Sequence, residues 1–247
     1  MWTSSCWGRG QEVTLEYIAL YRRARDEDWT KEELLREAAR IPGIYVPSFY
    51  EPVYRPDGTL EEMRIREGSG APELVRKRVV EDMNKSYFPV KTIIPSTEIV
   101  HDRVMLELFR GCIRGCRFCQ AGYVYRPVRS RDPKQLAEYG KAACEDSGYQ
   151  EMTLSSLSST DYPCLLELCD DLLDYCAPRD IGLSLPSLRA DTFSMNLMER
   201  LQRVRKGGLT FAPEAGTQRL RDAINKISGR RTFSSPAAPP FPAVGVE

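Results

Sequence analysis

The spacing of apolar residues predicts short, mixed elements at the start of this 247-residue chain. Residues 13–26 and 30–40 place apolar side chains at helical intervals, and Thr30 with Glu33 forms a capping box that begins the second helix. Two alternating runs then flank a turn at residues 55–58, a pattern typical of a β-hairpin. The chain is therefore predicted to begin with a small α+β segment.

Apolar runs alternating with amphipathic helices begin at Val104 and predict parallel βα units. The helix after the first run is predicted to begin at Asp132, an N-cap, with Pro133 next and Gln135 as its capping-box partner. About four units can be counted, so the predicted class is α/β. The predicted strands are residues 104–109, 151–155, 181–185 and 208–211.

Changes in composition predict the domain boundaries. Residues 66–98 are charged and interrupted by proline, which is typical of a linker, so residues 1–98 are predicted to be the N-terminal helical and hairpin segment with its linker. Residues 99–227 are predicted to form the α/β core. Residues 228–247 turn into a proline- and alanine-rich tract, and we expect a disordered tail there.

The bulk composition excludes several classes of protein. Lysine plus arginine and aspartate plus glutamate both number 35, so no global charge favours a nucleic acid or an acidic membrane. No stretch approaches the roughly 20 apolar residues of a membrane span, and the start lacks the profile of a secretion signal. We expect a cytoplasmic protein that has no membrane partner. Its single histidine, His101, excludes catalysis built on several histidines.

Three of the eight cysteines stand together in residues 111–122, directly after an apolar run. Cys112, Cys116 and Cys119 lie within eight residues of a glycine-containing loop, which can fold three sulfurs around one iron-sulfur cluster. Such clusters normally take four thiolates, so one iron would stay open. A structural zinc site would need a fourth ligand that the sequence does not offer. The remaining cysteines are predicted to fill the core: Cys6, Cys144, Cys164, Cys169 and Cys176.

The spacing C-x3-C-x2-C with an aromatic residue at Phe118 resembles the signature of the radical S-adenosylmethionine (SAM) superfamily. The resemblance implies a (β/α) barrel of the TIM type, here partial, with a 4Fe-4S cluster on the three cysteines. It further implies that the open iron chelates SAM, and that an electron from the reduced cluster cleaves SAM to a 5′-deoxyadenosyl radical. An electron donor such as a flavodoxin or ferredoxin is then expected, while the substrate is unknown.

The same resemblance implies SAM contacts at Phe118 of the motif and where the predicted strands end. Ser156 and Ser158 follow the second strand, at the position of the family's SAM-amine segment, although this chain has serines there instead of the commoner Gly-Gly-Glu. Ser187 and Arg189 follow the third strand and are candidates for the ribose or the SAM carboxylate. Glu214 follows the fourth strand, and Thr217 is predicted to cap the next helix. Each of these groups can equally be a cap or turn residue.

Further segments resemble narrower groups. The chain is similar to tRNA methylthiotransferases and, more closely, to an uncharacterised bacterial group that has a cobalamin-binding-type domain before the barrel. That comparison implies that most of the N-terminal domain and the last βα units are absent, so we expect a truncated chain, with cobalamin only in a full-length relative. The segments concerned are residues 41–50, 109–112, 129–133, 148–154 and 215–220.

Six arginines and no acidic residue lie between Arg110 and Arg131. They either form a basic patch for RNA phosphates or balance the charge of a thiolate cluster and a SAM carboxylate, and the second explanation needs no extra partner. Three hypotheses remain: a radical SAM enzyme, which we favour, an inactive truncated fragment that binds the cluster, and a zinc-stabilised RNA-binding module.

Overall fold

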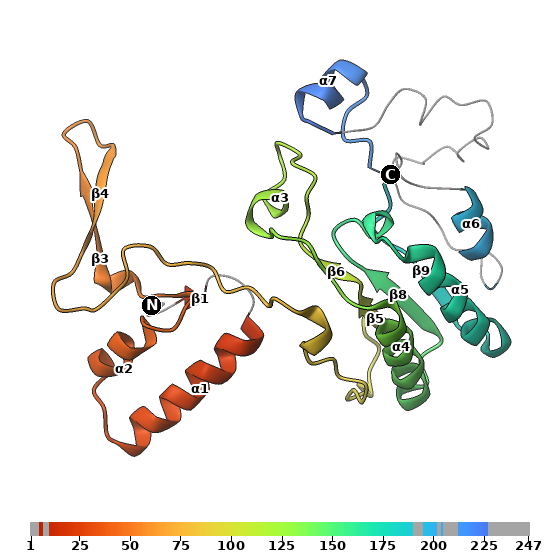
Figure 1. Cartoon of the computed structure of the whole chain (residues 1–247), viewed down its shortest axis with the longest axis horizontal. Helices are drawn as coiled ribbons and strands as arrows, with labels where there is room; N and C mark the ends of the chain where they lie inside the picture. The colour runs from red at the N-terminus through yellow and green to blue at the C-terminus, as the bar shows by residue number, and fades with distance from the viewer. Residues whose placement is uncertain (1–4, 7–9, 190–194, 202–203, 205–211, 227–247) are drawn as a thin grey trace. The chain divides into compact units, whose positions relative to one another are not determined.

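The computed structural model has two compact units, Met1–Glu81 and Asp82–Glu247, which are described separately (Figure 1). The predicted strand at residues 208–211 and the predicted tail at 228–247 lie outside the described part. The described residues are 5–6, 10–189, 195–201, 204 and 212–226. No helix among them is long and apolar enough to cross a membrane.

The described part of the first unit consists of helices α1 and α2 and two antiparallel strand pairs, β1–β2 and β3–β4. The predicted capping box is confirmed, because the Glu33 carboxylate accepts from the Thr30 N–H (2.7 Å) and the Thr30 hydroxyl accepts from the Glu33 N–H (3.3 Å). Val13 of α1 and Leu35 of α2 pack in one apolar cluster with Phe49. The elements are β1 (Ser5–Cys6), α1 (Gly10–Asp26), α2 (Lys31–Ala38), β2 (Ile44–Tyr45), β3 (Tyr50–Tyr54) and β4 (Leu60–Ile65).

The second unit is built on a parallel sheet with strand order β5-β8-β9. Three of the four predicted strands are therefore confirmed as parallel neighbours, and closure into a barrel remains a prediction. The elements are β5 (Val104–Glu107), β6 (Phe109–Arg110), α3 (Ala121–Val124), β7 (Arg129–Ser130), α4 (Pro133–Ser147), β8 (Glu151–Ser155), α5 (Leu165–Cys176), β9 (Gly182–Ser184), α6 (Met195–Leu201) and α7 (Gln218–Ala223).

The first predicted strand, residues 104–109, is not one continuous strand. β5 ends at Glu107, and β6 pairs with β7 in the antiparallel sense. Leu108 lies between them and still bonds to both neighbours, since its N–H donates to Ser155 O (3.0 Å) and its carbonyl accepts from the Arg131 N–H (3.0 Å). The break turns the chain out of the parallel sheet immediately before the cysteine loop.

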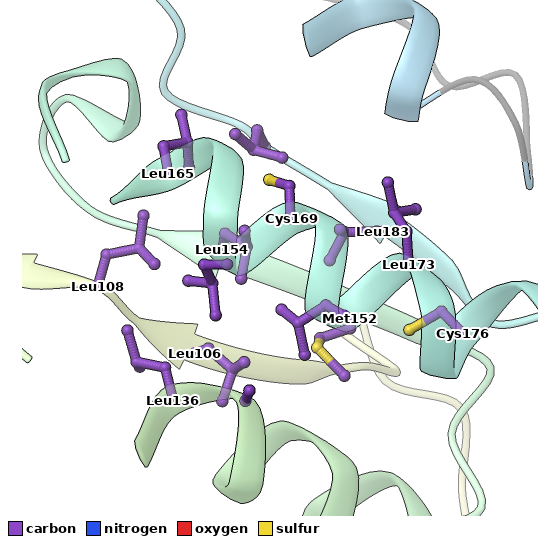
Figure 2. Packing of buried hydrophobic residues seen from close by; sticks show 14 of the residues in the cluster. Leu106, Leu108, Leu136, Met152, Leu154, Leu165, Cys169, Leu173, Cys176 and Leu183 are labelled. Atoms are coloured by element: carbon purple, nitrogen blue, oxygen red, sulfur yellow. The ribbon is translucent and has the colours of Figure 1, made fainter. Parts of the chain in front are cut away.

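Helices α4 and α5 cover one face of this sheet and enclose the main core (Figure 2). Leu106 of β5, Met152 of β8 and Cys169 of α5 are fully buried there, and burying a leucine or methionine side chain contributes about 1.5–3 kcal/mol. Gly140 allows α4 to approach the sheet closely, because a Cβ at this position would lie 2.9 Å from Leu106 Cδ1.

The start of α4 differs from the prediction in one respect. The Asp132 carboxylate caps the helix as predicted, accepting from the N–H groups of Lys134 (2.9 Å) and Gln135 (3.2 Å). Gln135 does not complete a capping box, because its side chain donates instead to Asn84 O (3.1 Å). Asn84 Oδ1 accepts from the Asp132 N–H (2.7 Å) and takes the predicted role of Gln135. A tertiary contact thus replaces the local one.

Candidate functional site

The face of the parallel sheet opposite α4 and α5 is more polar than the helix-covered face. Side chains alternate along a strand, so Met105 and Thr153 point away from the helices while their neighbours Leu106 and Leu154 enter the core. Met105, Thr153 and Ser184 lie side by side in register, and the hydroxyls of Thr153 and Ser184 are 2.8 Å apart. Parallel strands have their carboxyl ends at one edge, where such folds place their sites.

The cysteine loop follows β6 at this carboxyl edge. Cys116 is buried, while Cys112 and Cys119 are partly exposed. Gly111 has φ +97°, and a Cβ there would lie 2.4 Å from a backbone oxygen of the chain that returns after α3, so only glycine fits. The Arg114 N–H points at Cys112 Sγ (3.4 Å), and the Cys119 N–H bonds to Cys116 O (3.0 Å).

The three sulfurs are not gathered as a preformed metal site. Among the described residues, no three histidine, cysteine or carboxylate side chains are close enough together to hold one metal ion. The prediction that these cysteines bind a cluster therefore rests on their chemistry and spacing.

The arginines predicted to form a patch or to balance charge all have intramolecular partners. Arg126, for example, donates to Gly122 O (2.7 Å) and Ile113 O (3.2 Å) and so ties the loop to itself. Arg110 is buried and chelates the Glu107 carboxylate. These bonds suit a third role for the arginines, which is to brace the cysteine loop. They do not test the two roles predicted from the sequence, binding of RNA phosphates and balance of the cluster's charge. The other acceptors are Asp161 for Arg114, Ala223 O for Arg117, Pro127 O for Arg129 and Ser86 O for Arg131.

Arg114 connects the cysteine loop to the loop that follows β8. Its guanidinium makes a two-point contact with the Asp161 carboxylate, through Nε to Oδ2 (2.9 Å) and through Nη2 to Oδ1. Ser158 donates its hydroxyl to the same carboxylate (2.8 Å). Burial by itself raises the pKa of Asp161, but the hydrogen bonds from Arg114 and Ser158, together with the charges of Arg114 and Arg189, outweigh it and lower the pKa. Asp161 is thus a charged anchor that the sequence analysis did not single out.

Four of the predicted SAM-contact residues gather around this anchor. The Ser156 hydroxyl is 3.0 Å from the Ser159 hydroxyl, and the Ser159 N–H donates to Ser187 O (2.9 Å), which joins the loops after β8 and β9. Arg189 is buried near Asp161, whose pKa its charge lowers. The structure therefore brings Ser156, Ser158, Ser187 and Arg189 to one place.

The two other predicted SAM contacts, Phe118 and Glu214, do not lie among the four residues around Asp161. Phe118 is 55% exposed and projects from the cysteine loop. Glu214 has φ +68°, and its carboxylate pairs with Lys226 (3.1 Å). Thr217 caps α7 as predicted, accepting from the Leu220 N–H (3.3 Å). Glu214 is thus part of the polar contacts that flank α7.

The other cysteines with described side chains belong to the core or its border, as predicted. Burial raises the pKa of Cys169 to about 12 and the pKa values of Cys144 and Cys176 to about 11. Cys164 packs, partly buried, against the same core. The Cys6 side chain lies outside the described part. Thiols of this kind stay protonated near neutral pH and are poor metal ligands.

Two curated proteins are similar to parts of this chain. A region of 131 residues is 38% identical to "Uncharacterized protein MJ0966" of Methanocaldococcus jannaschii and covers 53% of this chain and 28% of that protein. A region of 158 residues is 23% identical to "Putative methylthiotransferase MJ0865" of the same archaeon and covers 60% and 34% of the two chains. The chain therefore spans about a third of the length of the curated relatives it matches.

The family comparison covers the unit that contains the site. The model of the radical SAM superfamily matches residues 106–234, just over half of the chain. The matched region begins in β5 and includes the cysteine loop, β8 and β9. The chain belongs to the radical SAM superfamily.

Proposed function

We propose that this chain is a radical SAM enzyme in which Cys112, Cys116 and Cys119 hold a 4Fe-4S cluster. The observation that carries the proposal is the meeting of three loops. The Arg114–Asp161 contact joins the cysteine loop to the loop after β8, and the bond from the Ser159 N–H to Ser187 O joins that loop to the loop after β9. The donor set fits such a cluster, because it offers three thiols with a backbone N–H directed at one sulfur. The bound cluster would supply the electron for reductive cleavage of SAM.

The chain's own residues would bind and orient SAM. Arg189 carries the positive charge suited to the SAM carboxylate, and Ser187, two residues earlier in the same loop, is proposed for the ribose. Ser156 and Ser158 lie on the loop that the family uses for the amine. Asp161 would hold these groups at a fixed distance from the cysteine loop, because it is bonded to both sides. Phe118 and Glu214 are proposed as outer contacts.

The partners follow from this chemistry. The enzyme would take an electron from a donor such as a flavodoxin or ferredoxin and would work in the cytoplasm. The name of one relative makes methylthio transfer the first reaction to test, with RNA among the substrates. Cobalamin is proposed only for a longer relative.

The test is release of 5′-deoxyadenosine from SAM by anaerobically reconstituted, dithionite-reduced protein. Cys116→Ala should abolish both iron retention and release, whereas the matched variant Cys169→Ala should retain both, because Cys169 lies in the core. Release that is equal in the two variants would overturn the proposal. Iron and sulfide without release would support the alternative of an inactive cluster-binding fragment, and zinc without sulfide would support the RNA-binding module.

A further inference from the structure

The C-terminal end of α7 contacts the cysteine loop at two residues. The Arg117 N–H donates to Ile224 O (2.9 Å), and the Arg117 guanidinium donates to Ala223 O. The Asn225 side-chain amide donates to Gly115 O (2.8 Å). These bonds join segments that are more than 100 residues apart in the sequence.

The contacts lie on both sides of one cysteine. Gly115 directly precedes Cys116 and Arg117 directly follows it. Cys116 is 8% exposed and is buried, unlike Cys112 and Cys119. The turn after α7 therefore fixes the backbone immediately before and after the central cysteine of the motif.

The contacts match the chemistry of a helix end. The last carbonyls of a helix lack partners within the helix, and a cation is favourable there. Arg117 supplies both a donor and a charge to Ala223 O and Ile224 O. Asn225 has φ +54°, a left-handed conformation that asparagine tolerates better than most residues. This conformation ends the helix while the amide reaches Gly115 O.

We propose that Arg117 and Asn225 are positioning residues that clamp the cysteine loop to α7 and hold Cys116 in place for the cluster. The inference rests on the proposed function of the loop. It assigns to α7 a part in retention of the cluster, through bonds to backbone atoms on either side of a ligand. Neither residue touches the reacting atoms.

Two substitutions separate the clamp from simple helix termination. Asn225→Gly keeps a residue that readily adopts positive φ but loses the amide. Asn225→Asp keeps the size of the side chain but places a carboxylate against the Gly115 carbonyl, which removes the donor and adds repulsion. Gln218→Ala is the matched control, since Gln218 lies on the same helix and its side-chain amide contacts Asp222 (2.7 Å) and Arg221 (3.1 Å), both residues of α7 and neither part of the cysteine loop.

The test has two readouts. Hydrogen exchange of the Arg117 amide is measured on the metal-free chain, and loss of iron to a chelator is measured on the reconstituted chain. We expect exchange and iron loss to rise about threefold to tenfold in Asn225→Gly and by more in Asn225→Asp, as the loss of one hydrogen bond implies. Gln218→Ala should match the unsubstituted chain in both, and far-UV circular dichroism checks that every variant is folded.

The outcomes distinguish the clamp from the proposed function. Exchange and iron loss in Asn225→Gly equal to those of the unsubstituted chain would overturn the clamp, as would faster exchange without faster iron loss. If the unsubstituted chain holds no iron after reconstitution, the proposed function fails instead, and the exchange data still decide whether α7 fixes the loop.

Discussion

Replacing Asp161 with alanine should destabilise the second unit by about 2 kcal/mol. Exposed ion pairs contribute about 0–1 kcal/mol, and removing one partner of a buried pair costs about 3–5 kcal/mol. The Arg114 and Asp161 side chains are 22% and 16% exposed, so the cost should fall between these limits. The substitution leaves the Arg114 guanidinium and the Ser158 hydroxyl without their shared acceptor.

A double-mutant cycle with Arg114→Met isolates the pair from the rest of the loop. We expect a coupling energy of about 1.5 kcal/mol, because both changes remove the same contact. A coupling energy below about 0.5 kcal/mol would refute the view that the two side chains act as one anchor. Asp161→Asn is the milder control, since it keeps an acceptor for Ser158.

The assay must report on the second unit alone. All three tryptophans precede residue 30, so their fluorescence reports on the first unit. Cys169 is fully buried in the second unit, and its alkylation at increasing urea concentrations, followed by mass spectrometry, gives the free energy of opening. The same variants measured by tryptophan fluorescence should show no change, which is the internal control.

Three further predictions concern the glycine before the cysteine motif, the charge of Asp161 and the reactivity of two cysteines. Gly111→Ala should lower the free energy of unfolding, measured by thermal denaturation, by about 2 kcal/mol or more, because its Cβ would meet a backbone oxygen at 2.4 Å. Gly148→Ala, also at positive φ but with open space around it, should lower the free energy of unfolding by less, and equal losses would contradict the steric argument. The unsubstituted chain should be more stable than Asp161→Asn above pH 3.8, the ordinary pKa of an aspartate, and this difference should disappear as the pH falls through the lower folded pKa of Asp161, as measured by circular dichroism. A difference that grows on acidification would refute the lowered pKa. At pH 8 in native buffer, Cys119 should react with iodoacetamide long before Cys169, whose pKa is about 12, and comparable rates would show that the core is open.

The elements that the sequence predicted well are those fixed by local rules. The strand at 151–155 and the capping box at Thr30 are confirmed because a short apolar run and cap chemistry involve only neighbouring residues. The first strand and the partner of Asp132 were wrong in detail because tertiary contacts decided them. A pattern of apolar residues does not show that Asn84, 48 residues away, competes for the same N–H.

Local sequence features likewise indicated part of the candidate site, whereas the residue that depends on a tertiary contact was missed. The cysteine spacing and the loops after the strands can be read directly from the sequence. Asp161 was not singled out, because nothing local marks an aspartate in a serine-rich turn as the partner of Arg114. The sequence did contain one signal. Asp161 is the acidic residue in the segment between the second predicted strand and the helix that follows it.

The bonds that hold the cysteine loop have a consequence for the order in which the chain folds. Contacts between residues 114 and 161 span 47 positions, and the contact between residues 115 and 225 spans 110. Contacts of such high sequence separation form late, because the closure of long loops costs entropy before any bond is made. During synthesis, the cysteines emerge long before Asn225 does. A nascent chain therefore presents the three thiols before Asp161 and α7 can hold their loop. Under the proposed function, iron delivered at that stage would meet a loop without its clamp.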